Sequence, residues 1–218
     1  MITTEFVIYD RVNQDDHIAT ALAFVNQNLQ TELVADITVL GATPPLTNYG
    51  SCYFLAPQNI PESDIAQLPL ACTYMILWRT SVDNVCWGGG NYGLAINGRP
   101  TCTIPCNVGY WETLQPAWGH HLVWAETVII HELHHNFENF LFDLLGYPIA
   151  MRRSEHTYGA TVPHMDRMSD FGFTDHDEWS AWAYQQISPE MCTAIEAFCG
   201  AVSPPPASGG LLVFEESR

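Results

Sequence analysis

The stretch that most constrains the fold is a long apolar segment with ionisable side chains near its middle. It extends from about Trp118 to Leu145, and Gly146 and Pro148 follow as stop signals. Apolar residues recur on nearly every helical face, so we expect one largely buried helix of about 27 residues, or about 40 Å. Inside it lies the sequence His-Glu-Leu-His-His at 131–135, an H-E-x-x-H motif.

The spacing of this motif predicts a metal site. Residues four apart share a face of a helix, so the imidazoles of His131 and His135 can hold one metal ion. Glu132 lies beside them, placed to take a proton from a metal-bound water. Burying adjacent ionisable groups costs free energy unless they bind a partner such as a metal ion. The pattern therefore favours a bound divalent metal over a set of surface histidines.

The part of the chain before the motif alternates between strand-like and helix-like patterns. We expect a β-α-β opening, a buried strand after it, and then an edge strand that reaches a return strand through the turn Asn97-Gly98. The expected elements are a strand at 5–9, a helix from Asp15 or Asp16 to about Leu29, and strands at 33–40, 71–78, 92–96 and 101–108.

The part after the motif is mainly polar and then helical. Residues 149–176 lack periodicity, a helix at about 178–187 follows with Asp175 or Asp177 as its cap, and a further helix runs from Ser188-Pro189 to about Phe198. Residues 203–218 begin with a Pro- and Gly-rich stretch. These patterns predict an α+β fold with an N-terminal subdomain at 1–146, a C-terminal subdomain at 147–202 and a tail at 203–218.

The amino-acid composition limits the classes of molecule that this protein is expected to bind. There are 24 acidic and 7 basic residues, all seven of them Arg, and the net charge is −17. This charge disfavours binding to nucleic acid or to an anionic membrane, and no apolar run is long enough to span a bilayer. The seven cysteines include no C-x-x-C pair, and their number favours an oxidising compartment with up to three disulfides. We therefore expect an extracellular protein. Because no signal peptide is recognisable, we expect this sequence to be the processed form.

The motif, the β-α-β opening and the edge strand together resemble the zincin metallopeptidases. The resemblance implies a twisted mixed sheet packed on the motif helix, a smaller and mainly helical C-terminal subdomain, and a Zn²⁺ ion in the cleft between them. It also implies that His131 and His135 bind the zinc, that Glu132 is the general base, and that the substrate is a peptide or protein chain cleaved internally.

Catalytic zinc sites usually have three protein ligands, so a third must follow the motif. The metzincin branch of the superfamily continues with Gly and then His, but this chain has Glu138 and Leu141 there. It looks more like the gluzincin branch, whose third ligand is a Glu on a later helix, and the segment Glu178-Trp-Ser-Ala181 matches that pattern. The resemblance thus implies Glu178 as the third ligand. The alternatives are His164, Asp166, Asp170 and His176.

The expected reaction also needs a donor for the oxyanion that forms during hydrolysis. Tyr158 and His164 are our candidates, with His176 and Tyr184 as alternatives. A different function is a non-catalytic, zincin-like module that binds metal or acts as an effector. The presence of Glu132 argues against it, because a pure binding protein has no need of the base. A di-iron carboxylate site is disfavoured, since it needs a second E-x-x-H motif.

Overall fold

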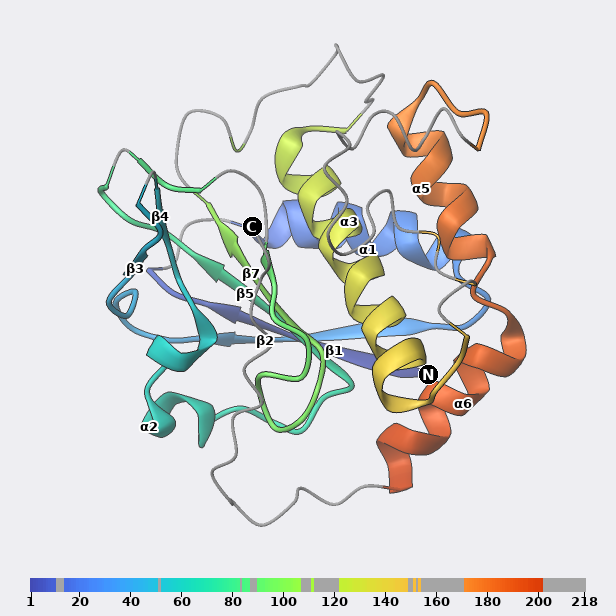
Figure 1. Cartoon of the computed structure of the whole chain (residues 1–218), viewed down its shortest axis with the longest axis horizontal. Helices are drawn as coiled ribbons and strands as arrows, with labels where there is room; N and C mark the ends of the chain where they lie inside the picture. The colour runs from blue at the N-terminus through green and yellow to red at the C-terminus, as the bar shows by residue number, and fades with distance from the viewer. Residues whose placement is uncertain are drawn as a thin grey trace.

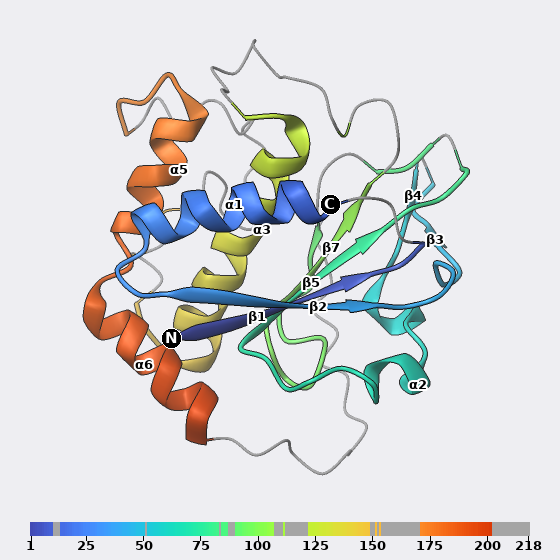
Figure 2. The ribbon, with the colours of Figure 1, turned by 180° about the vertical axis from the view of Figure 1, so that it is seen from behind.

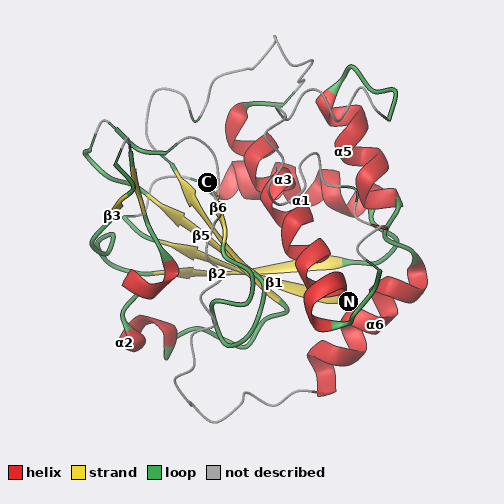
Figure 3. Cartoon of the chain, viewed as in Figure 1, coloured by secondary structure: helices red, strands yellow, loops and turns green. Residues whose placement is uncertain are grey.

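The chain folds into a mixed α/β structure in which the long helices lie on one side of a central sheet (Figures 1 and 3). The structure is a computed structural model, and it describes residues 1–10, 14–50, 52–82, 84–86, 90–106, 111, 122–148, 151, 153 and 171–201. The expected α+β class agrees with this architecture.

The central sheet has five strands in the order β2-β1-β5-β7-β6. The four strands β1, β2, β5 and β7 are parallel, and β6 pairs antiparallel with β7 at one edge. Their bounds are Ile2–Ile8 for β1, Leu33–Val39 for β2, Thr73–Trp78 for β5, Gly90–Asn91 for β6 and Thr101–Pro105 for β7. Two further short strands, β3 (Thr47–Asn48) and β4 (Tyr53–Phe54), form a separate antiparallel pair.

Helices α1, α3, α5 and α6 surround one face of the sheet, and the short α2 lies on the other side (Figures 1 and 2). The helices span Asp15–Asn28 for α1, Glu62–Ile65 for α2, Trp124–Asn139 for α3, His176–Gln185 for α5 and Pro189–Ala201 for α6. A 3-10 turn, η1, spans Pro57–Asn59, and a π-helical turn, η3, spans Phe140–Leu144. None of these helices is long and apolar enough to cross a bilayer.

The β-α-β opening is confirmed by β1, α1 and β2. Ile18 and Val25 face the sheet from α1, as the helical spacing predicts, and they are buried. The predicted cap was wrong: Gln14 precedes the first turn, and its side chain makes no capping hydrogen bond. Asp15 and Asp16 are the next two residues, inside the first turn, where carboxylates interact favourably with the helix dipole.

The two faces of the sheet carry separate hydrophobic cores, because successive side chains of a strand point to opposite faces. Phe6 and Leu77 belong to the larger core, beneath α1 and α3. Val7 and Trp78, their neighbours in sequence, belong to the smaller core beneath η1 and α2. The residues of β5 are all buried, since helices and loops cover both of its faces.

The edge of the sheet differs from the prediction. The antiparallel edge strand lies at Gly90–Asn91 and is two residues long, whereas the sequence favoured 92–96. The expected turn is present, and Asn97 and Gly98 both have positive φ angles of 52° and 66°. The return strand β7 then pairs antiparallel only with β6 and runs parallel to β5.

The motif helix α3 begins later than expected. Val123 has an extended backbone conformation, so regular helix starts at Trp124 and not near residue 118. Glu126 accepts a hydrogen bond from the Val123 backbone N–H and so satisfies one donor at the helix start. After Asn139 the helix widens into η3, and Gly146 follows with a φ of +71°, in agreement with the predicted stop.

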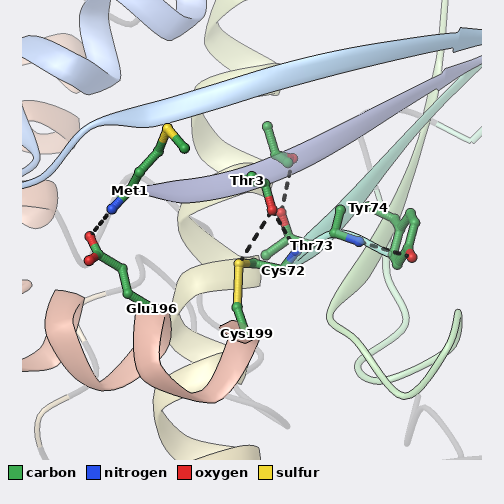
Figure 4. The surroundings of a disulfide bond; sticks show 9 residues. Met1, Thr3, Cys72, Thr73, Tyr74, Glu196 and Cys199 are labelled. Carbon is green, nitrogen blue, oxygen red and sulfur yellow. Dashed lines mark hydrogen bonds and ion pairs between the residues drawn. A yellow bond between two sulfur atoms is a disulfide. The ribbon is translucent and has the colours of Figure 1, made fainter. Parts of the chain in front are cut away.

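Two disulfides link distant parts of the described chain. Cys52 pairs with Cys86, and Cys72 pairs with Cys199. The second bond joins the end of α6 to the start of β5, where the Thr3 hydroxyl also contacts the Cys72 sulfur (Figure 4). Two disulfides are one fewer than the sequence allows. The remaining three cysteines are buried thiols, namely Cys102, Cys106 and Cys192.

One ionisable side chain lies inside the sheet. Glu5 is in the middle of β1, has no exposed surface, and sits beside Asp36 and Tyr74 of the neighbouring strands. Burial raises the pKa of Glu5; Thr38 partly offsets this, and the nearby Asp36 adds to it. Because the folded-state pKa is raised, this group favours folding below its unfolded pKa, and that advantage is lost as the pH rises through the folded pKa.

Replacing Glu5 by Gln should therefore stabilise the protein at pH 7, by about 1 kcal/mol, because no charge is then buried. Near pH 3 the two proteins should unfold at similar urea concentrations, since Glu5 itself is then protonated. Urea titrations at both pH values measure this. Glu62→Gln, an exposed change of the same charge, is the control. A Glu5→Gln protein that is less stable at pH 7 would contradict the expectation.

Candidate metal centre

The motif helix is fixed to the sheet through its central asparagine. Asn136 is fully buried, and its side-chain N–H group donates to the backbone oxygen of Tyr74 in β5 at 3.1 Å. The same nitrogen lies 3.3 Å from the Met75 sulfur. A buried hydrogen bond to a strand's backbone sets both the height and the rotation of α3 on the sheet. Because His135 precedes Asn136 in α3, this bond also sets the position of His135 relative to the sheet.

The two motif histidines converge as their spacing predicts. The Nε2 atoms of His131 and His135 are 3.0 Å apart, and the ring centroids are 4.6 Å apart. Two imidazole nitrogens bound to one zinc at about 2.1 Å in tetrahedral geometry lie about 3.4 Å from each other. At 3.0 Å one ring can donate an N–H to the other, and a small opening of the pair makes the spacing of a zinc chelate.

Glu132 lies next to this pair and is also buried. Its side chain is 7 % exposed, and one carboxylate oxygen is 3.9 Å from the Nε2 atom of His131. On the sheet side it approaches Cys102 of β7: burial raises the pKa of that thiol well above its usual value, and the Glu132 charge adds to the effect. A carboxylate in such a place, one helix position from His131, can accept a proton from a group held at the two histidines.

A second carboxylate supports His135 from the other side of the imidazole. One oxygen of Glu138 is 3.8 Å from the Nδ1 atom of His135. The other oxygen accepts a hydrogen bond of 2.6 Å from the backbone N–H of Arg153. A carboxylate near Nδ1 favours the tautomer whose proton is on Nδ1, and Nε2 can then bind a metal. Glu138 also ties the segment at residue 153 to the motif helix.

Helix α5 packs beside α3 and runs parallel to it, so later residues of α5 contact later residues of α3. His134 contacts the rings of Trp179 and Tyr184, and Phe137 contacts Tyr184 one turn later. The Tyr184 hydroxyl donates to the backbone oxygen of Ile130 at 2.7 Å. His134 is buried against α5, off the face that carries the motif pair, as expected from its place in the helix.

The first turn of α5 brings a third histidine close to His131. The His176 ring lies 6.1 Å from the His131 ring, centroid to centroid, with 25° between their planes. It is 5 % exposed, and its Nδ1 atom is 3.3 Å from the Ser180 hydroxyl. Asp175 caps the helix by accepting hydrogen bonds from the backbone N–H groups of residues 177 and 178, which confirms one of the two predicted caps.

Glu178, the third ligand implied by the family resemblance, is not brought to the motif histidines. Its side chain is exposed on the first turn of α5. It follows His176 by two residues, which is about 200° around a helix, so the two side chains point in nearly opposite directions. Because α5 turns His176 toward α3, it turns Glu178 toward solvent.

The other sequence candidates divide into two groups. Tyr184 was an alternative oxyanion donor, but it is completely buried and its hydroxyl is bonded to the α3 backbone. Tyr158 and His164, the preferred donors, lie outside the described residues, as do Asp166 and Asp170. Ser180 was missed. Its signal in the sequence is the four-residue spacing from His176, which places a hydroxyl and an imidazole on one helical face.

Across the described ranges, no three or more His, Cys, Asp or Glu side chains are grouped closely enough to hold a metal ion as they stand. What these residues offer is a convergent pair of imidazoles, a carboxylate beside each of them and a third imidazole nearby. Nitrogen donors of this kind suit Zn²⁺. The donor set therefore fits the ion that the motif implies.

Comparisons with family models, with curated proteins and with solved structures found no match to this chain.

Proposed function

We propose that this protein is a zinc-dependent metallopeptidase of zincin-like build that cleaves peptide or protein chains internally. The observation that carries the proposal is the 3.0 Å separation of the His131 and His135 Nε2 atoms, with the buried Glu132 carboxylate beside them. A convergent pair of imidazoles at i and i+4 with an adjacent carboxylate matches the needs of metal-assisted hydrolysis. The two disulfides are compatible with action in an oxidising, extracellular compartment.

In this proposal His131 and His135 hold the zinc through Nε2. When bound, zinc supplies Lewis acidity, which lowers the pKa of water and polarises a carbonyl group. Glu132 takes the proton of the attacking water on its carboxylate and then delivers it to the leaving amine. Its burial keeps competing water away and strengthens its interaction with nearby charges. Glu138, with one carboxylate oxygen 3.8 Å from the His135 Nδ1 atom, favours the tautomer whose Nε2 can bind a metal.

The test is zinc content and proteolysis of an unfolded protein substrate, with Glu132→Gln as the matched variant. We expect about one zinc per chain in both proteins, because Glu132 is not a ligand. Cleavage should fall on the order of 10³-fold in the variant, the usual contribution of a general base. A chelator should stop cleavage by the parent, and added zinc should restore it.

Two results would overturn the proposal. One is parent protein that takes up no zinc at stoichiometric concentrations. The other is a Glu132→Gln protein that cleaves as fast as the parent, since its carboxamide cannot accept the proton. Zinc uptake without cleavage by the parent would favour a metal-binding module without catalysis.

A further inference from the structure

The position of α5 bears on which side chain completes the zinc site. Three protein ligands are usual for catalytic zinc, and the motif supplies two. Glu178 faces solvent, whereas His176 is buried beside His131. We propose that His176 is the third zinc ligand, so that the site is built from three imidazoles. This inference rests on the zinc-dependent function proposed above.

Distance supports the assignment. Two imidazoles bound through Nε2 to one zinc have ring centroids roughly 5–6 Å apart, given Zn–N bonds of about 2.1 Å. The His131 and His135 centroids are 4.6 Å apart, and those of His131 and His176 are 6.1 Å apart. The His176 ring is thus about as far from His131 as shared coordination allows. Shared coordination would require the His176 side chain to move toward the pair when zinc binds.

The orientation of the His176 ring supports it as well. Its Nδ1 atom is 3.3 Å from the hydroxyl of Ser180, which lies one helical turn later and is itself buried. When the ring donates its Nδ1–H to this hydroxyl, Nε2 keeps the lone pair that can bind a metal, and the contact limits rotation of the ring. Trp179 packs against the same imidazole at 5.4 Å between centroids. Ser180 is therefore a positioning residue for His176.

The position of the whole helix is set two turns away from the site. Tyr184 donates to the Ile130 backbone oxygen, and that residue directly precedes His131. Since α5 is rigid over this distance, the bond between Tyr184 and Ile130 also fixes how far His176 stands from the motif pair. The exposure of Glu178 follows from the same constraint, because turning Glu178 inward would remove both His176 and Tyr184 from α3.

The experiment measures zinc affinity by competition with a chromophoric chelator, for the parent protein, His176→Ala, Glu178→Gln and Ser180→Ala. We expect His176→Ala to bind zinc at least 100-fold more weakly and Glu178→Gln to bind within about twofold of the parent. Ser180→Ala should bind about 10-fold more weakly, as for other residues that orient a ligand. Thermal unfolding in the presence of a chelator checks that each variant folds.

A spectroscopic variant keeps the proposal testable even if His176→Ala fails to fold. In cobalt-loaded His176→Cys we expect a thiolate-to-cobalt charge-transfer band, which appears only when residue 176 binds the metal directly. The Co²⁺ form of Ser180→Cys should lack this band.

The outcomes separate this inference from the proposed function. If the parent binds zinc and His176→Ala binds it equally well, His176 is not a ligand, while the metallopeptidase proposal stands. Loss of zinc in Glu178→Gln, with His176→Ala unaffected, would assign Glu178 instead. Absence of the charge-transfer band in a folded, cobalt-loaded His176→Cys would also overturn the inference. A parent that binds no zinc would overturn both proposals.

Discussion

Replacing Cys72 and Cys199 by alanine should lower the free energy of unfolding by about 5 kcal/mol. The bond between them closes a loop of 127 residues, the wider of the two disulfide loops. In the chain-entropy account, a disulfide restricts the unfolded chain, and the effect grows with the logarithm of the loop length. The measurement is urea unfolding of metal-free protein, followed by tryptophan fluorescence.

The matched control is the other disulfide. Removal of the Cys52–Cys86 bond, which spans 34 residues, should cost about 4 kcal/mol by the same relation. Thiol titration in denaturant should give three free thiols in the parent and in each double variant. A Cys72→Ala/Cys199→Ala protein as stable as the parent would mean that α6 is held by its packing alone.

Replacing Phe137 by alanine should cost about 3–5 kcal/mol. This side chain is fully buried in the larger core, on the turn of α3 that follows the motif, and its ring contacts that of Tyr184 at 6.1 Å between centroids. Truncation would remove the contact and leave a cavity between α3 and α5, which cannot close without moving both helices. Urea unfolding in the presence of a chelator measures the loss without the contribution of bound metal.

Phe142 provides the control for this change. It lies five residues later and is only partly buried, so Phe142→Ala should cost less than half as much. Equal losses for the two variants would show that burial does not determine the effect.

The sequence was informative where a segment's own pattern decided its structure. The β-branched and aromatic composition and the helical spacing before Leu40 correctly predicted β1, α1 and β2, because these patterns lie within each segment's own residues. The spacing of His131 and His135 correctly predicted that their side chains converge, because both lie on one helix.

Features that depend on contacts between distant elements could not be predicted as well from the sequence. The pattern of the helix starting near residue 176 favoured Glu178 as a ligand. In the structure Glu178 is exposed on α5, and α5 is bonded to α3 through Tyr184 and the Ile130 backbone, a contact that no local pattern contains. The edge strand was misplaced for a similar reason, because pairing with Thr103 and Cys102 of β7 decides which two residues belong to it. Propensity could not rank Gly90 as a strand residue.

The three buried thiols can be used to measure how often the structure around them opens. Burial raises the pKa of Cys192 to about 11 and that of Cys102 well above its usual value, so little reactive thiolate is present in the closed state. A thiol reagent should then react only when the surrounding structure opens. Cys102 lies under the motif helix α3 and Cys192 lies within α6, so their labelling rates would compare the opening of the structure around α3 with that around α6.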